Sequence, residues 1–123
     1  MRYTLLLHYP EMSAEELGEE MLAEGKAAFH AYARALDEAG VLVSAEVLQP
    51  SSATTTVSFR NGRLHVQDGP YADTKEQLGG YYLIDVPDLD AAMTWAARCP
   101  GADHGTVEVR PVAPSPPPGP HAR

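Results

Sequence analysis

The sequence predicts an α+β domain of the ferredoxin-like kind, a βαββαβ unit with a β-hairpin inserted into it. Short β-prone or apolar runs recur along the chain and alternate with two stretches in which apolar residues repeat at helical spacing. Two of the β-prone runs flank Asn61-Gly62, a dipeptide typical of a tight hairpin turn. The chain has 123 residues, 44% of them hydrophobic, which suits one domain with its own core.

The first strand and the first helix are predicted within residues 3–39. Residues 3–9 form an apolar run without alternation, as expected of a strand buried on both faces. Ser13 and Glu16 then form a capping box, which predicts a helix start. Apolar residues three and four positions apart continue this helix to residue 39. Gly25 could kink the helix or divide it in two.

The remaining elements follow from the same kinds of pattern. Strands are expected on both sides of the Asn61-Gly62 turn and on both sides of a second helix, which Asp88 caps. The strand after the first helix could contain a bulge, because polar residues interrupt its apolar runs. The expected ranges are 41–48, 54–59, 63–66, 79–86 and 106–112 for the strands and 88–98 for the second helix.

Both helices would cover one face of the resulting four-stranded sheet and leave the other face bare. A second copy of the chain is the usual cover for such a face. The sequence therefore predicts a homodimer, with two sheets face to face. We assign residues 1–112 to the domain and residues 113–123, which include five prolines and a glycine, to a disordered tail.

Composition restricts the partners and the compartment. Nine Lys and Arg against 17 Asp and Glu give a net charge of −8, which argues against nucleic acid or an anionic membrane as a partner. The first residues resemble neither a signal peptide nor a membrane span of about 20 residues. Cys99 is the only cysteine, so no intramolecular disulfide can form, and we expect a cytoplasmic location. No zinc-site spacing, phosphate loop or dinucleotide fingerprint is present, so we expect no metal and no cofactor.

A longer motif, DGPYADTKEQLGGYYLID, spans residues 68–85. It resembles the DGPF segment of the YCII-related family, with Tyr71 where that family has phenylalanine. The resemblance covers residues 1–112 and includes residues 39–42 and 48–50. It implies a dimeric α/β-barrel-type fold with a ligand cleft in each protomer.

The resemblance also implies two kinds of function. Some similar proteins lie beside extracytoplasmic-function sigma factors in bacterial genomes, which implies a regulatory link. A more distant branch includes a dehydrochlorinase of an aromatic-ring metabolite, and a His–Asp pair is proposed elsewhere in the family; both imply acid–base chemistry. The histidine of that pair would lie on the first helix, where this sequence has Phe29, with His30 one residue away.

Asp68 and Lys75 are the first candidates for a site. An aspartate before Gly-Pro is a turn former whose carboxylate can accept backbone N–H groups. Alternatively, the Asp68 carboxylate faces the cleft as a base or ligand contact, with its pKa tuned by Lys75. Lys75 could itself bind an anionic substrate or stabilise an enolate. The alternative for residues 74–77 is a solvated loop with weak ion pairs.

His8, Glu76, Gln77 and Tyr81 complete the set of candidates. His8, near the end of the first strand, is the best proton-transfer group by residue type, and it could converge with Asp68 if their strands are neighbours. Otherwise it makes one hydrogen bond at the edge of the core. Glu76 could shuttle a proton, and Gln77 belongs to the same polar stretch. Tyr81 and the tyrosine after it point to opposite sides of their strand, so one packs and the other could offer its hydroxyl to a ligand.

Two functions are open at this stage. The first is a small-molecule-handling protein, in its sharper form a cofactor-free acid–base enzyme of the isomerase or lyase type. Its cleft would lie between the first helix and the sheet, with Asp68, His8 and Lys75 as catalytic groups and residues 76, 77 and 81 as ligand contacts. The second is a non-catalytic dimeric regulatory or binding module.

Overall fold

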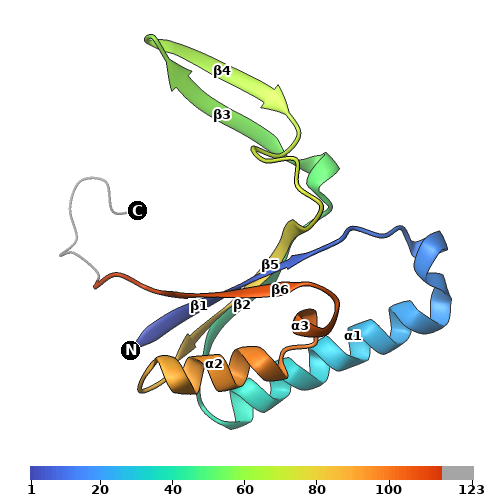
Figure 1. Ribbon diagram of the computed structural model, residues 1–123, viewed down its shortest axis with the longest axis vertical. Helices are drawn as coiled ribbons and strands as arrows, with labels where there is room; N and C mark the ends of the chain where they lie inside the picture. The colour runs from blue at the N-terminus through green and yellow to red at the C-terminus, as the bar shows by residue number, and fades with distance from the viewer. Residues whose placement is uncertain (115–123) are drawn as a thin grey trace.

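A four-stranded antiparallel sheet is the centre of the structure, a computed structural model that describes residues 1–114. Its strands lie side by side in the order β2-β5-β1-β6 (Figure 1). Every neighbouring pair is antiparallel. The bounds are β1 Arg2–Tyr9, β2 Leu42–Val47, β5 Gln77–Asp85 and β6 Thr106–Pro111.

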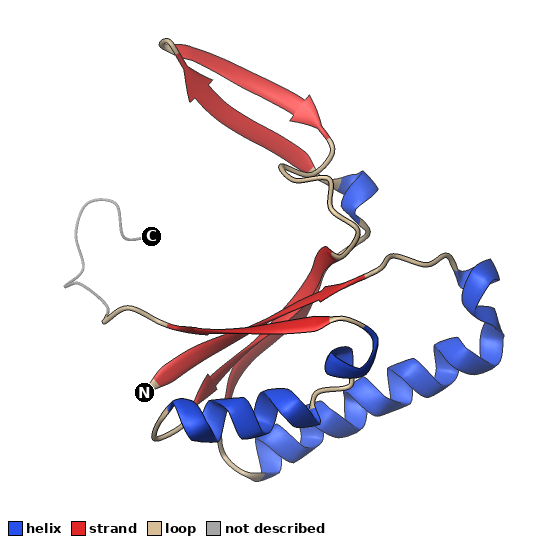
Figure 2. Cartoon of the chain, in the orientation of Figure 1, coloured by secondary structure: helices blue, strands red, loops and turns tan. Residues whose placement is uncertain are grey.

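The helices cover one face of this sheet. α1 (Ala14–Glu38) and α2 (Leu89–Arg98) lie on the same side of the strands, as Figure 2 shows. A short helix that the sequence did not predict, α3 (Gly101–His104), joins α2 to β6. With the hairpin set aside, the element order is βαββαβ, so the predicted α+β, ferredoxin-like fold class is confirmed. We call the face without helices the open face.

The core lies between the sheet and the helices. Leu5 and Ile84 of the two inner strands and Leu36 of α1 have no exposed surface. The Tyr32 ring of α1 meets the Tyr82 ring of β5 edge-on, with 5.1 Å between the ring centroids. Burial raises the pKa of both phenols, and that of Tyr82 rises to about 12. Leu5, Tyr82 and Ile84 of the inner strands therefore pack on the helical side.

α1 begins as predicted but is interrupted at a different glycine. The Ser13 hydroxyl accepts a hydrogen bond from the Glu16 N–H at 3.1 Å, and the Glu16 carboxylate accepts one from the Ser13 N–H at 3.2 Å, which confirms the capping box. The interruption lies at Gly18, where φ is 81°, and the helix continues through Gly25, so the expectation for Gly25 is wrong. Because glycine has no Cβ, Gly18 adopts a positive φ without a clash, whereas Gly25 keeps helical φ and ψ.

The β3–β4 hairpin forms a separate two-stranded sheet that projects from the rest of the chain (Figure 1). β3 (Thr55–Arg60) and β4 (Arg63–Asp68) pair along their whole length. Asn61 and Gly62 have φ values of 52° and 73°, the two positive values that a type I′ turn requires, so the hairpin prediction is confirmed. A short 3₁₀ helix, η1 (Ser51–Ala53), leads from β2 into the hairpin.

Two irregularities interrupt the ladders of β5. One lies opposite Leu42 and Ser44 of β2, which confirms the predicted bulge in that strand. The other lies at the end of β1, where Leu7 pairs with Gly80 and His8 pairs with Leu78, leaving residue 79 as the extra residue. Bulges re-aim side chains and are common beside functional sites. Of the predicted tail, residues 115–123 lie outside the described residues, so its disorder stays a prediction.

Candidate functional site

A pocket of about 550 Å³ lies beside His8, at the end of the sheet where the hairpin begins. We call it the junction pocket. It is formed by the end of β1, by η1 with its flanking residues, and by the loop between β4 and β5. Its walls are His8, Leu48, Gln49, Pro50, Ser51, Ala53, Thr54, Pro70, Tyr71, Ala72, Thr74, Glu76, Gln77 and Leu78.

The junction pocket is built largely from the segments on which the family resemblance was based. Residues 48–50 form one part of its wall, and residues 70–78 of the long motif form another. These segments precede and follow the hairpin, and the antiparallel pairing of β2 with β5 brings them together. The Leu48 N–H donates to the Gly79 carbonyl at 2.9 Å, which continues this pairing up to the pocket. Much of the first half of the motif therefore lies at the junction pocket.

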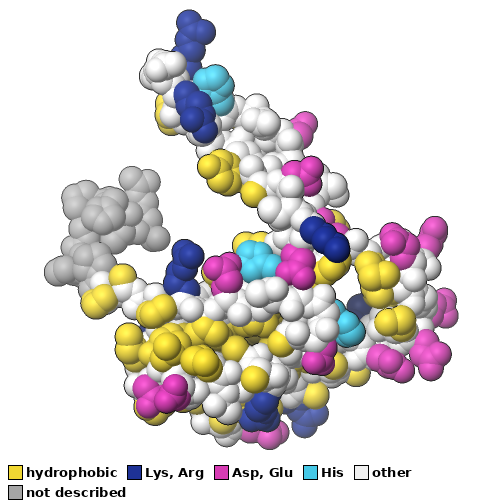
Figure 3. Space-filling model, viewed as in Figure 1, with side chains coloured by type: hydrophobic (Ala, Val, Ile, Leu, Met, Phe, Trp, Pro, Cys, Tyr) yellow, Lys and Arg dark blue, Asp and Glu magenta, His cyan; other side chains and the backbone are white. Residues whose placement is uncertain are grey.

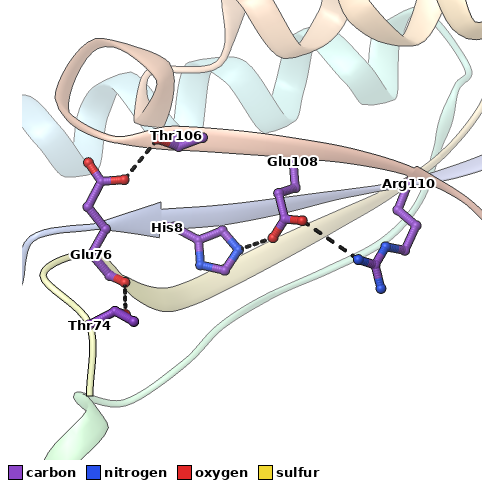
Figure 4. Close-up of polar contacts among 6 residues, drawn as sticks. All are labelled: His8, Thr74, Glu76, Thr106, Glu108 and Arg110. Atoms are coloured by element: carbon purple, nitrogen blue, oxygen red, sulfur yellow. Dashed lines mark hydrogen bonds and ion pairs between the residues drawn. The ribbon is translucent and has the colours of Figure 1, made fainter. Parts of the chain in front are cut away.

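His8 makes a short polar contact with Glu108 at this place. His8 lies opposite Thr106 in the β1–β6 ladder, so Glu108, two residues further along β6, is its diagonal neighbour on the open face. Nε2 of His8 lies 2.5 Å from Oε1 of Glu108, and Oε2 of Glu108 lies 3.7 Å from Nη2 of Arg110 (Figure 4). Because an ionised carboxylate only accepts, Nε2 of His8 is the donor, and Nδ1 of the neutral ring keeps a free lone pair. The carboxylate thus fixes the tautomer of a histidine that lines a pocket.

Glu76 and Thr106 form a second polar contact beside this pair. The Thr106 hydroxyl donates to Oε1 of Glu76 at 2.8 Å, and the Thr74 hydroxyl donates to the Glu76 carbonyl at 2.5 Å (Figure 4). Thr106 belongs to β6, whereas Glu76 lies in the loop before β5, on the far side of β1. The structure therefore brings the predicted residues His8 and Glu76 to the same pocket.

Gln77 uses its side-chain amide to order the pocket loop. Its Nε2 donates to the carbonyls of Ala72 at 2.9 Å and Thr74 at 3.1 Å. Both amide protons are then used within the loop, so the side-chain oxygen is the group that remains for a ligand. The predicted ligand contact by Gln77 stays a prediction, and the observed contacts add a positioning role.

Glu11 holds Ser51 of η1, one of the residues that line the pocket, in place. Its carboxylate accepts hydrogen bonds from the Ser51 N–H at 2.6 Å and from the Ser51 hydroxyl. These hydrogen bonds lower the pKa of Glu11. The contact joins the loop after β1 to η1, and it thereby ties the four-stranded sheet to the segment that leads into the hairpin.

The structure separates Asp68 from His8. Asp68 is the last residue of β4 and pairs with Thr55 of the hairpin, whereas the neighbours of β1 are β5 and β6. The condition for convergence of His8 and Asp68 is therefore not met, because the hairpin pairs with itself and leaves the main sheet. Within residues 1–114 the Asp68 side chain makes no hydrogen bond, so the expected carboxylate-to-backbone turn is not formed. The turn depends on Gly69, whose φ is 102° and whose N–H donates to the Thr54 carbonyl at 2.8 Å.

Lys75 is also outside the pocket. It is an exposed loop residue, and neither Lys75 nor Asp68 is among the residues that line the junction pocket. Within the described part of the chain, Lys75 forms no ion pair with Asp68. The catalytic roles expected of these two residues stay predictions, and the geometry of the pocket does not favour them.

A larger cleft of about 1030 Å³ lies between α1 and the sheet, at the place where the sequence analysis expects one. The space exists because the buried side chains of α1, Tyr32 and Leu36, are confined to its second half. Leu17, Met21 and Phe29 of α1 line the cleft, and much of the remaining wall is apolar. A cleft with this composition can hold an apolar ligand.

A few polar residues also line this cleft. The predicted site residue Tyr81 borders this cleft, but it pairs with Leu6, so its side chain is on the open face; its role as a ligand contact stays a prediction. Lys26 and His30 contribute from α1, and His104 contributes from α3. His30 is the residue next to the position to which the family's histidine was aligned, and the structure places it at the cleft. His8, a catalytic candidate, and Glu76, a ligand-contact candidate, line the junction pocket, outside this cleft.

Sequence reasoning missed Glu108, the partner of His8. The alternation of residues 106–112 indicates a half-buried strand, and it puts Thr106, Glu108 and Arg110 on one face. The alternation predicts that these three polar side chains share a face, but it does not predict that β1 is the neighbouring strand. The contact joins residues 100 positions apart and depends on the register between the first and last strands.

Among residues 1–114, no three or more His, Cys, Asp or Glu side chains are grouped so that they could hold a metal ion. In the same part of the chain, no helix has both the length and the apolar character needed to cross a membrane.

Comparison with known proteins gives two matches. A family model described as the YCII-related domain matches residues 1–115. A protein of Rhizobium meliloti (strain 1021), described as "Uncharacterized protein R00369", is 45% identical over 78 residues. That match covers 62% of this chain and 63% of the relative, so the chain spans just under two thirds of the relative's length.

Proposed function

Because the chain belongs to the YCII-related domain family, we propose that it binds a small molecule in the junction pocket and moves a proton there without a cofactor. One observation carries the proposal. Nε2 of His8 lies 2.5 Å from the Glu108 carboxylate, and His8 lines a pocket built from the family motif. In the single chain the side chains of His8 and Glu108 are 27% and 45% exposed, so neither is enclosed in the core.

The pair supplies a general base of a familiar kind. Glu108 accepts the Nε2 proton of His8, which leaves Nδ1 of His8 to take a proton from the ligand. As the imidazole becomes an imidazolium, the adjacent carboxylate stabilises the positive charge. The same imidazolium can return its proton to another atom of the ligand, so an isomerase or a lyase is the reaction class that this geometry favours. Glu108 acts as a positioning residue, because it touches His8 rather than the ligand.

The charges at the pocket favour a neutral ligand. Among the described residues that line it there is no lysine or arginine, and Glu76 contributes a carboxylate. Glu108, the partner of His8, adds a second carboxylate, and Arg110 is already paired with Glu108. An anionic substrate would meet carboxylates with no cation to balance them. A neutral carbonyl compound with an acidic C–H bond fits these charges best.

Proton exchange in deuterated water tests this function without knowledge of the natural substrate. A panel of neutral ketones is incubated with the protein, and the loss of C–H signals is followed by NMR. We expect catalysed exchange, and we expect His8→Asn and Glu108→Gln to lower its rate by about 100-fold or more. His65→Asn, an exposed position of β4 away from the pocket, should leave the rate unchanged. Exchange that persists in His8→Asn would contradict the proposed base.

The larger cleft favours a second candidate, a non-catalytic binding module. The cleft is nearly twice the volume of the junction pocket and has largely apolar walls. An apolar probe that perturbs the NMR signals of Met21 and Phe29, together with no exchange activity above buffer, would favour this candidate over the enzyme.

We further propose that either function is performed by a homodimer in which the open faces of two sheets meet. Among residues 1–114 no helix covers the open face (Figures 1 and 2), and Leu6 and Leu83 lie on it half-buried among polar residues. A sheet with one uncovered face commonly acquires a second layer from another copy of itself.

A further inference from the structure

The hairpin has one apolar face and one polar face. In the β3–β4 ladder Val57 pairs with Val66, and Phe59 pairs with Leu64, so these four side chains share one face. Their exposed fractions are 58% for Val57, 58% for Val66, 74% for Phe59 and 56% for Leu64. The opposite face carries polar residues such as Ser58 and its partner His65.

Such a hairpin requires a covering surface. A lone two-stranded hairpin is at best marginally stable in water, and an apolar sheet face is normally packed against another layer. The hairpin has both features, yet it projects away from the helices and from the main sheet (Figure 1). A contiguous exposed apolar surface with polar surroundings is typical of an interaction site.

The hairpin and the start of α1 lie at the same end of the main sheet but on opposite sides of it. β1 and β2 both run antiparallel to β5, so the end of β1, the end of β2 and the start of β5 lie together. The hairpin is inserted between β2 and β5, and α1 follows β1. In Figure 1 the helices lie below the sheet and the hairpin rises above it.

We propose that the hairpin is an exchange arm that packs its apolar face on the first half of α1 in a second copy of this chain. When two copies are related by a twofold axis along their strands, with open faces together, each hairpin lies at the end where the partner's α1 begins. Six residues per strand give the arm a length of about 20 Å, comparable to the sheet and helix layers it has to pass. In such a dimer each hairpin packs on α1 of the other copy, so no arm is left unpaired.

The receiving surface matches the arm in polarity and in charge. Met12, in the loop just before the N-cap of α1, and Met21, in the first half of the helix, are 50% and 54% exposed, and the buried residues of the helix lie beyond them. Methionine adapts its shape to an incoming apolar surface. Arg60 and Arg63 flank the turn at the free end of the arm, and glutamates occupy the first turns of α1. Figure 3 shows Lys or Arg side chains at the tip of the hairpin and Asp or Glu side chains at the end of the molecule where α1 begins. Opposite charges therefore flank an apolar contact on both partners.

This inference rests on the proposed homodimer but is independent of the proton-transfer chemistry. Sedimentation velocity of the full chain over a range of concentrations separates the two. We expect a dimer whose dissociation constant rises by about 100-fold or more in Phe59→Ser/Leu64→Ser, because two apolar anchors are lost. The matched control Ser58→Ala/His65→Ser changes the opposite face of the same strands and should leave the dissociation constant unchanged. Unaltered circular dichroism confirms that the main sheet remains folded in both variants.

Disulfide trapping tests the receiving surface. A Leu64→Cys chain is mixed with a Met21→Cys chain under mild oxidation, while the buried Cys99 stays in both. We expect a mixed disulfide dimer from this pair and none when Ser58→Cys replaces Leu64→Cys. A wild-type monomer overturns the arm and the proposed dimer together. A dimer that is unaffected by Phe59→Ser/Leu64→Ser, or trapping that is equal at positions 58 and 64, overturns the arm and leaves the dimer intact.

Discussion

The four-stranded sheet and the two-stranded hairpin carry similar apolar side chains but expose them to different degrees. Leu5 and Ile84 in the main sheet have 0% exposed surface, whereas Val57 and Phe59 in the hairpin have 58% and 74%. Alternation along a strand therefore determines which face is apolar, and packing of the helices determines which apolar face is covered. The difference indicates that the main sheet holds the fold together, while the hairpin has apolar surface available for association.

Truncation of one apolar side chain in each sheet should give the largest contrast. Leu5→Ala leaves a cavity in a packed core, so we expect it to lower the free energy of unfolding by about 2–5 kcal/mol. Phe59→Ala should change it by less than about 0.5 kcal/mol at protein concentrations at which the chain is monomeric. Urea unfolding at low concentration measures both values. Equal losses would show that the hairpin contributes to the core.

Alanine in place of glycine gives the next contrast. A Cβ at Gly105 would lie 2.1 Å from the His8 carbonyl oxygen and 2.8 Å from Tyr9 Cα, so the end of β1 must move. We expect Gly105→Ala to cost about 1–3 kcal/mol and to displace His8 from Glu108. Gly62 in the hairpin turn has open space around it and a φ of 73°, so Gly62→Ala should cost roughly 1 kcal/mol and leave the His8 signals in place. NMR and urea unfolding report both effects, and a shifted His8 in Gly62→Ala would contradict them.

Alkaline pH should weaken the main sheet through its buried phenols. Burial raises the pKa of Tyr82 from 10.0 to about 12 and raises that of Tyr32 as well, so the folded state keeps protons that the unfolded state has lost. Their contribution to stability is complete below pH 10 and is lost as the pH rises through the folded values. Urea unfolding below pH 10 and again between 10 and 12 should show this fall, and Tyr82→Phe should make it smaller. A stability that is constant up to pH 12 would be inconsistent with burial of the phenols.

Acid should have the smallest effect, at the connection between the two sheets. Hydrogen bonds from Ser51 hold the pKa of Glu11 below its ordinary value of 4.5, so the stabilising contact is complete above that pH. It is lost as the pH falls through the lower value of the folded state. Hydrogen exchange of the η1 amides should accelerate on acidification, and Glu11→Gln should show little of this change. If acid still accelerates hydrogen exchange of the η1 amides in Glu11→Gln, groups other than Glu11 cause the effect.

The sequence predicted local structure well where one short motif determines the backbone. Asn61-Gly62 adopts the two positive φ values of a hairpin turn, and Ser13 with Glu16 forms its capping box. The break in the first helix was expected at Gly25 but lies at Gly18. Glycine permits a break at either position, and the sequence does not show which of the two glycines leaves the helical conformation.

Sequence reasoning found some of the residues that line the junction pocket and missed others, for reasons of register and topology. His8 and Glu76 line one pocket, as side chains of a strand end and of the loop before a buried strand. Glu108 was missed because its contact with His8 depends on the pairing of β1 with β6. The separation of Asp68 from His8 could not be predicted, because a motif on the chain does not reveal that the hairpin carries Asp68, its last residue, away from the main sheet. Such long-range pairing has no signal within a single strand.

The tautomer of His8 is the most direct test of the proposed site. Long-range ¹H–¹⁵N NMR of the imidazole distinguishes a ring protonated at Nε2 from one protonated at Nδ1. At a pH where the ring is neutral, we predict Nε2–H for His8, with loss of this preference in Glu108→Gln. An Nδ1–H ring, or a preference that Glu108→Gln leaves unchanged, would contradict the assignment of Nδ1 as the base at this pocket.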